Sequence, residues 1–162
     1  DAAGIPWDHG LALGSMVEVP SIALIAAIAV REVDFISVGT NDLTQYLCAA
    51  DRMNSAVRQY YQEYHPAVFR LLAHLAEVCR RAGKDISVCG ELGGDPLAIP
   101  ALAGMGICRL SMGAASLAGA KRVVRAMRLS EARALAAEVL QLGTHGEIRA
   151  RLQAFAQEKG II

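Results

Sequence analysis

The chain lacks an excess of either charge and any long apolar run. Its 162 residues carry 16 basic and 16 acidic side chains, for a formal net charge of zero. Nucleic-acid binders need clustered Lys and Arg, so we expect no nucleic-acid partner. The longest apolar run, Ile22–Val30, is far shorter than the ~20 residues of a membrane helix. Because 54% of the residues are hydrophobic, we expect buried strands and core-facing helices and no membrane partner.

Cysteine pairing is also missing. The four cysteines, Cys48, Cys79, Cys89 and Cys108, form no Cys-x-x-Cys pair and have no nearby His-x-His spacing. A zinc or disulfide framework is therefore not expected, and a reducing, cytoplasmic setting fits best. The chain shows no secretory leader and does not begin with Met, so we expect it to be a piece of a longer protein.

Four short apolar segments, each followed by a helical pattern, indicate an α/β fold. Strands are predicted at residues 16–19, 35–38, 86–89 and 109–112. Helices are predicted at 21–31, 66–81, 96–103 and 114–127. Two more helices should end the chain, one over 131–142 capped by Ser130 and one that begins in a capping box at Thr144. The alternation predicts right-handed βαβ units on a parallel sheet.

Polar or glycine-rich residues stand at the carboxyl end of every predicted strand. Four βα units are either half of a (β/α)8 TIM barrel or a small open sheet. Chemistry gathered at the carboxyl ends of several strands is the arrangement of barrel enzymes, whereas an open sheet concentrates its ligand at one switch point. We therefore expect half of a barrel over residues 1–128, followed by a helical tail of the same domain over 129–162.

Two carboxylates are candidate metal ligands. Glu18 interrupts an apolar strand, where an unpaired charge is costly to bury, and Asp42 follows the next strand. If the strands are neighbours, both carboxylates face one mouth, and two hard oxygen ligands with water and a phosphorylated substrate suit Mg²⁺. The alternative is a Glu paired with a basic residue and an Asp in an ordinary turn.

Other residues near these strand ends could contact a ligand. The turn 39–42 offers free backbone N–H groups to an anion, or it caps a helix. The guanidinium of Arg52 matches phosphate oxygens, although lone surface Arg residues are common. Cys89 ends a strand and could move a proton, or it is a small buried hydrophobe. Gly90 would let a ligand approach the backbone closely.

Three long motifs, in order and sensibly spaced, resemble those of phosphoenolpyruvate-utilising enzymes. Residues 14–21 (GSMVEVPS) resemble the strand with the metal-binding Glu, and 35–46 (FISVGTNDLTQY) resemble the second carboxylate motif. Residues 88–95 (VCGELGGD) resemble the signature of the catalytic cysteine. Within this superfamily, 51–54 and 64–68 resemble Enzyme I of the bacterial sugar phosphotransferase system more than pyruvate phosphate dikinase. The resemblance covers essentially the whole chain from Gly14.

The resemblance implies a role for each candidate residue. Glu18 and Asp42 would hold Mg²⁺, and Asn41, Asp42 and Arg52 would contact the phosphate of phosphoenolpyruvate. Cys89 would protonate the enolate carbon as pyruvate forms, and Gly90 would shape the pocket around it. Charge neutralisation by the metal and by a guanidinium is what phosphoryl transfer needs.

The implied activity is phosphoenolpyruvate–protein phosphotransfer, to a histidine on the way to an HPr-type phosphocarrier. The family barrel has eight strands, and only the last four are present here, so we expect this chain alone to be inactive. The missing parts would include the domain that contacts the carrier, and the family also implies a homodimer. Two other interpretations remain open: a domain of the pyruvate phosphate dikinase or phosphoenolpyruvate synthase type, and a non-catalytic dimerisation module.

Overall fold

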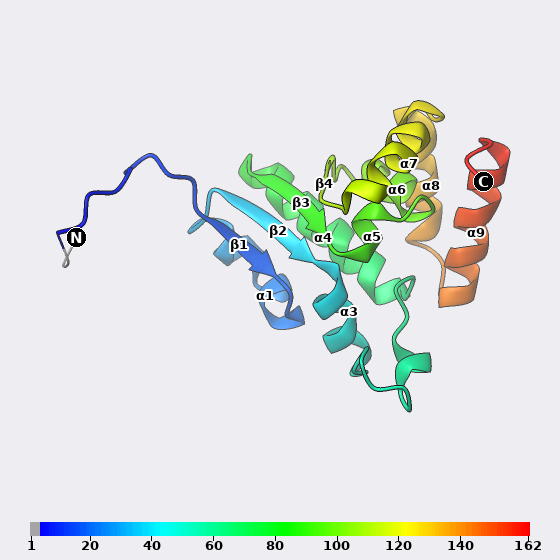
Figure 1. Cartoon of the computed structure of the whole chain (residues 1–162), viewed down its shortest axis with the longest axis horizontal. Coiled ribbons are helices and arrows are strands. Elements are labelled where there is room, and N and C mark those ends of the chain that lie inside the picture. The colour runs from blue at the N-terminus through cyan, green and yellow to red at the C-terminus, as the bar shows by residue number, and fades with distance from the viewer. Residues whose placement is uncertain (1–3) are drawn as a thin grey trace.

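Four short parallel strands form one sheet, in the order in which they occur in the chain (Figure 1). The structure is a computed structural model that describes residues 4–162. The strands are β1 (Gly14–Val17), β2 (Phe35–Gly39), β3 (Asp85–Cys89) and β4 (Arg109–Leu110). The predicted α/β class with a parallel sheet is confirmed.

Helices follow every strand. They are α1 (Pro20–Leu24), α2 (Ala26–Ala29), α3 (Thr40–Cys48), α4 (Pro66–Ala82), α5 (Glu91–Gly94), α6 (Ala98–Gly104), α7 (Ala114–Arg125), α8 (Leu129–Val139) and α9 (His145–Glu158), with one short 3-10 helix, η1 (Arg58–Tyr60). Within residues 4–162, no helix is long and apolar enough to cross a membrane.

Several element bounds differ from those predicted. β1 ends at Val17, because Pro20 takes a first-turn position of α1 and Val19 is the extended residue before it. Glu18 therefore follows the strand instead of interrupting it. The predicted helix over 21–31 is broken at Ile25, whose ψ of 17° leaves the helical region. The chain after β2 enters α3 at Thr40 without a separate turn.

The two predicted helix starts in the tail have different outcomes. The helix α8 begins two residues earlier than predicted, and Arg128 is its N-cap in place of Ser130. The Arg128 backbone N–H donates to the Glu131 carboxylate over 2.8 Å. Glu131, which lies in the first turn of α8, thus satisfies the backbone N–H of the N-cap residue. The capping box of Thr144 and Glu147 at the start of α9 is confirmed.

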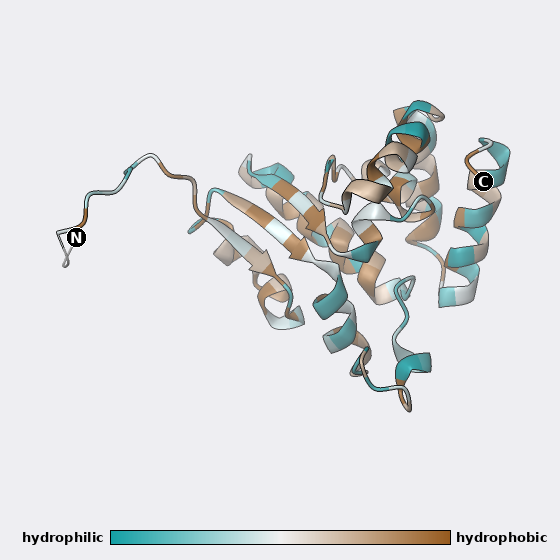
Figure 2. Ribbon diagram, viewed as in Figure 1, coloured by the Kyte–Doolittle hydropathy of each residue, from teal (hydrophilic) through white to brown (hydrophobic). Residues whose placement is uncertain are grey.

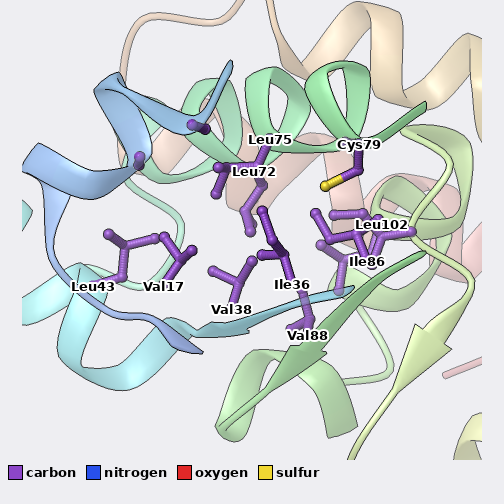
Figure 3. Packing of buried hydrophobic residues seen from close by; sticks show 14 of the residues in the cluster. Val17, Ile36, Val38, Leu43, Leu72, Leu75, Cys79, Ile86, Val88 and Leu102 are labelled. Carbon is purple, nitrogen blue, oxygen red and sulfur yellow. The ribbon is translucent and has the colours of Figure 1, made fainter. Parts of the chain in front are cut away.

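One face of the sheet packs against helices. Alternate strand residues Ile36, Val38, Ile86 and Val88 are at most 8% exposed. They contact a row of apolar side chains that α4 places above them, which includes Leu72 and shares one cluster with the strands (Figure 3). Because strand side chains alternate between faces, the residues between these positions point to the other face.

Among the described residues, 4–162, no helix covers the opposite face of the sheet. On it Met16 is 50% exposed and Phe35 is 37% exposed, and Ser37, Ser87 and Cys89 are partly buried. The register Met16–Ser37–Ser87 runs straight across the first three strands, so these side chains form one row. We call this surface the open face, and the surface under the helices the packed face.

A second core joins the tail to the rest of the chain. Phe69 of α4 and Ile99 of α6 pack with Leu135 of α8 and with Leu152 and Phe155 of α9. Polar residues cover much of the visible side of α9 (Figure 2). The division of the chain between residues 128 and 129 stays a prediction, because α8 shares this core with the helices before it.

Candidate functional site

The carboxyl ends of β1, β2 and β3 bring Glu18 and Cys89 to the two sides of Gly39. Gly39 pairs with Cys89 in the register of β2 and β3. On its other side lies the Glu18 side chain. A Cβ on Gly39 would stand 2.6 Å from Glu18 Cγ and 2.7 Å from Oε1. The absence of a side chain at Gly39 therefore makes room for the Glu18 carboxylate at the end of the open face.

Asp42 and Arg52 form an ion pair beside this strand end. Asp42 stands in the first turn of α3, and its Oδ1 lies 3.4 Å from the Arg52 guanidinium. The backbone N–H of Arg52 donates to Gln45 Oε1 over 3.1 Å, which ties the following loop to α3. Both side chains of the pair are 36% exposed, so the pair is screened by solvent and a ligand can reach it.

The first turn of α3 also holds the loop after β3. Thr40 Oγ1 donates to the carbonyl of Cys89 over 2.9 Å, and the N–H of Glu91 donates to Asn41 Oδ1 over 3.0 Å. Between these two bonds, Gly90 has φ of +100°, and a Cβ there would lie 2.7 Å from both Asn41 Oδ1 and Thr40 Oγ1. Only glycine meets both demands without strain. The Asn41 amino group remains free to donate to a ligand.

The Cys89 thiol belongs to the open face. Its sulfur lies 3.6 Å from Ser37 Oγ, 3.4 Å from the Val38 carbonyl oxygen and 3.6 Å from Met16 Sδ. Cys79, by contrast, is fully buried in the packed core. All four cysteines are free thiols. The thiol at position 89 is thus only partly buried and is set among polar and sulfur atoms near the strand ends.

Two cavities adjoin these residues. One of about 520 Å³ is lined by Asn41, Gly90 and Glu91 together with residues that follow β4. The other, of about 650 Å³, is lined by Arg52, Tyr61 and Glu91 among others. Both volumes are within the range of small-molecule sites.

The loop before α4 supplies groups that the sequence did not single out. Burial, with a smaller contribution from Glu63, raises the pKa of Tyr61 to about 12, so its hydroxyl stays protonated. This hydroxyl donates to the Asn41 carbonyl over 3.3 Å. Burial and then a hydrogen bond with Glu91 raise the pKa of Glu63. A single tyrosine in a polar loop belongs to no sequence pattern that would predict these contacts.

Carboxylates are spread around the mouth and do not form a closed cluster. Across residues 4–162, no group of three or more His, Cys, Asp and Glu side chains gathers closely enough to hold a metal ion. Any cation bound here would thus take its remaining ligands from water or substrate, as Mg²⁺ usually does.

The sequence is similar to one protein family model and to several characterised proteins. The family model for PEP-utilising enzyme, PEP-binding domain, where PEP is phosphoenolpyruvate, matches residues 1–129. Phosphoenolpyruvate-protein phosphotransferase of Geobacillus stearothermophilus is 43% identical over 145 residues, which cover 90% of this chain and 25% of the relative. The protein of the same name from Staphylococcus carnosus is 46% identical over 136 residues, 84% of this chain and 24% of the relative.

A relative from Escherichia coli strain K12, named phosphoenolpyruvate-dependent phosphotransferase system, is 42% identical over 149 residues, which cover 92% of this chain and 20% of the relative. The chain thus spans about a quarter or less of the length of these curated relatives. The match with the family model covers well over half of the chain. The chain therefore belongs to the PEP-utilising enzymes, in the family of their PEP-binding domain.

Proposed function

We propose that the chain is the PEP-binding part of a phosphoenolpyruvate–protein phosphotransferase. The whole enzyme would transfer the phosphoryl group of PEP to a histidine, on the way to an HPr-type phosphocarrier. One observation carries this proposal: Glu18, the Asp42–Arg52 pair and Cys89 all stand at the same end of the sheet, around Gly39. The names of the relatives favour this function over a dikinase or a non-catalytic dimerisation module.

The phosphate end of PEP would bind between α3 and the loop after it. Arg52 would contact phosphate oxygens through its guanidinium, and Asn41 would donate from its free amino group. The Asp42–Arg52 separation of 3.4 Å supports this, because one group for the metal and one for the phosphate are already side by side. Tyr61, as a protonated donor, fixes the backbone of Asn41 from the other side.

The residues present fit a divalent metal ion. PEP-utilising enzymes use a metal cofactor, and we propose Mg²⁺ here. Glu18 and Asp42 would hold it, since both are hard oxygen donors at neighbouring strand ends, and Gly39 leaves the Glu18 carboxylate uncovered. When bound, Mg²⁺ would neutralise charge on the phosphoryl group as it transfers. Arg52 would share that task from the protein side.

Cys89 would act at the other end of PEP. When the phosphoryl group leaves, the enolate of pyruvate needs a proton on its terminal carbon. The thiol S–H bond breaks, the new C–H bond forms, and the electron pair stays on sulfur as a thiolate. Gly90 would let the enolate approach the loop after β3 without meeting a side chain, which its lack of Cβ and its hold by Thr40 support.

Three wider features belong to the same proposal. The open face, with exposed Met16 and Phe35, fits the interior wall of a (β/α)8 barrel whose other strands lie outside this chain. The whole enzyme would be a homodimer. Four free thiols fit a reducing compartment, so we place the protein in the cytoplasm.

The test is isothermal calorimetry of the chain with PEP, with and without Mg²⁺. We expect Mg²⁺-dependent binding that Glu18→Ala and Asp42→Ala each weaken by about tenfold or more. Glu32→Ala is the matched control: it removes an exposed carboxylate before β2, at the other end of the sheet, and should leave binding unchanged.

Two results would contradict the proposal. Binding that is the same without Mg²⁺, or that survives both carboxylate substitutions, would remove the metal from the site. Pyruvate production from PEP by this chain alone would refute our expectation that it does not complete the phosphotransfer.

A further inference from the structure

We propose that Ser37 is a positioning residue for Cys89: its hydroxyl donates a hydrogen bond to the thiol sulfur, orients it and stabilises the thiolate. The proposal rests on the role proposed above for Cys89 as the proton donor. The Ser37 hydroxyl lies on β2, one strand away from Cys89, with Oγ 3.6 Å from Sγ. No part of the sequence motif around the cysteine includes this serine.

The atoms around the sulfur divide into one donor and two acceptors. The Val38 carbonyl oxygen, at 3.4 Å, and Met16 Sδ, at 3.6 Å, can only accept. Of these three groups within residues 4–162, the Ser37 hydroxyl is therefore the one that can donate a hydrogen. The thiol hydrogen points to one of the acceptors, and the sulfur lone pair receives the hydroxyl of Ser37.

Proton transfer changes the strength of each contact with the Cys89 sulfur. Once the thiol hydrogen has moved to the enolate carbon, the thiolate faces the lone pairs of Val38 and Met16 without a hydrogen between them. The bond from Ser37 then becomes charge-assisted, and such bonds are roughly twice as strong as neutral ones. Ser37 consequently stabilises the thiolate more than the thiol.

Charged neighbours do not provide this stabilisation. Glu18 lies over Gly39, the register partner of Cys89, and Glu91 follows Cys89 by two residues. Asp42, in the first turn of α3, is paired with Arg52. Carboxylates disfavour a nearby thiolate, so a neutral donor is what the chain offers.

The structure also contains a matched control. Ser87 is the register partner of Ser37 and lies on the same face, but its hydroxyl donates to the Ile36 carbonyl over 3.5 Å. Ser87→Ala removes the same hydroxyl group from β3, the strand next to that of Ser37, but this hydroxyl has no hydrogen bond to the Cys89 sulfur. Two other cysteines serve as internal standards: Cys108 is exposed, and Cys79 is fully buried and reports unfolding.

The experiment measures alkylation of each cysteine by iodoacetamide near neutral pH, resolved by peptide mass spectrometry in the 162-residue chain. The thiolate is the reacting form. Loss of the bond from Ser37 leaves the reacting form less stabilised, and an effect of about threefold on the rate is within the range of one hydrogen bond. We expect Ser37→Ala to slow alkylation of Cys89 about threefold relative to Cys108, and Ser87→Ala to leave the ratio unchanged.

A second pair of variants separates loss of the hydroxyl from loss of structure. Ser37→Thr and Ser37→Val have the same shape and differ in the hydroxyl alone, so the threonine variant should alkylate about threefold faster at Cys89. If Cys79 becomes reactive in Ser37→Ala, this pair decides the outcome. Equal rates in Thr and Val, or faster labelling of Cys89 in Ser37→Ala with Cys79 still protected, would overturn the proposal. Because alkylation needs no PEP, failure of PEP binding and failure of this inference are separate results.

Discussion

The two faces of the sheet use the same strands for opposite purposes. On the packed face, Ile36 and Val38 are almost fully buried against α4. On the open face, Ser37 lies between them in sequence, contacts the Cys89 thiol and stays partly accessible. A single strand thus gives every second residue to stability and the others to the site, because side chains alternate along β-structure.

Substitutions on the two faces should therefore affect different properties of the protein. Burial of apolar area holds the packed face, so changes there should act on the free energy of unfolding. Hydrogen bonds and close approach to glycine hold the site, so changes there should act mainly on ligand affinity and thiol reactivity.

Ile36→Ala should be the most destabilising of these substitutions. The side chain is 1% exposed in the core cluster, and its truncation leaves a cavity, so we expect a loss of about 2–5 kcal/mol in the free energy of unfolding. Met16→Ala removes a large side chain from the open face, where it is 50% exposed, and should cost less than about 1 kcal/mol. Urea denaturation followed by circular dichroism measures both, and equal losses would contradict the division between faces.

Gly90→Ala should affect stability and ligand binding together. The positive φ of +100° and the 2.7 Å approach to Thr40 and Asn41 predict a cost of about 1–3 kcal/mol and a loss of PEP affinity of about tenfold or more. Gly106→Ala is the matched control, since its φ is +93° but nothing lies within 4 Å of its Cβ. It should show the backbone cost alone. If calorimetric titration gave both variants the same PEP affinity, the close approach of Thr40 and Asn41 to Gly90 would not shape the site.

Local chemistry explains what the sequence predicted well. The start of α4 at Pro66 and its end before Gly83, which has φ of +65°, follow from residues that act within one turn. The capping box of Thr144 and Glu147 is local in the same way. The four strands were predicted in order because each is short, apolar and bounded by helix-starting residues.

The contacts of the site could not be predicted in the same way. The approach of Glu18 to Gly39 and the bond from Ser37 to Cys89 join residues that are 21 and 52 positions apart, and their pairing depends on strand register. Tyr61 reaches Asn41 from an irregular loop with no periodic pattern. The sequence motifs predict which residues lie at the carboxyl ends of the strands. The strand register and the loop before α4 determine which of these residues contact one another.

The smallest predicted effect compares two carboxyl groups and has opposite signs in the two regions. Burial, and then a hydrogen bond with Glu91, raise the pKa of Glu63 above its usual 4.5. In the tail, hydrogen bonds from Thr144 and Gly143 lower the pKa of Glu147 below 4.5. Ionised Glu63 therefore opposes folding, and ionised Glu147 favours it.

The two carboxyl groups should change the stability of the chain with pH in opposite directions. The contribution of Glu63 is fully present below about pH 4.5 and is lost as pH rises through its raised folded pKa, so Glu63→Gln should become more stable than the parent chain as pH rises from 4.5 toward 7. The contribution of Glu147 is present above about 4.5 and is lost as pH falls through its lowered pKa. Glu147→Gln should thus be less stable near pH 7, and the deficit should shrink as pH falls below 4.5. Urea midpoints across this range measure both differences. If the two curves shared one sign, the site would be stabilised by the same electrostatics as the tail, and the contrast between the two regions would fail.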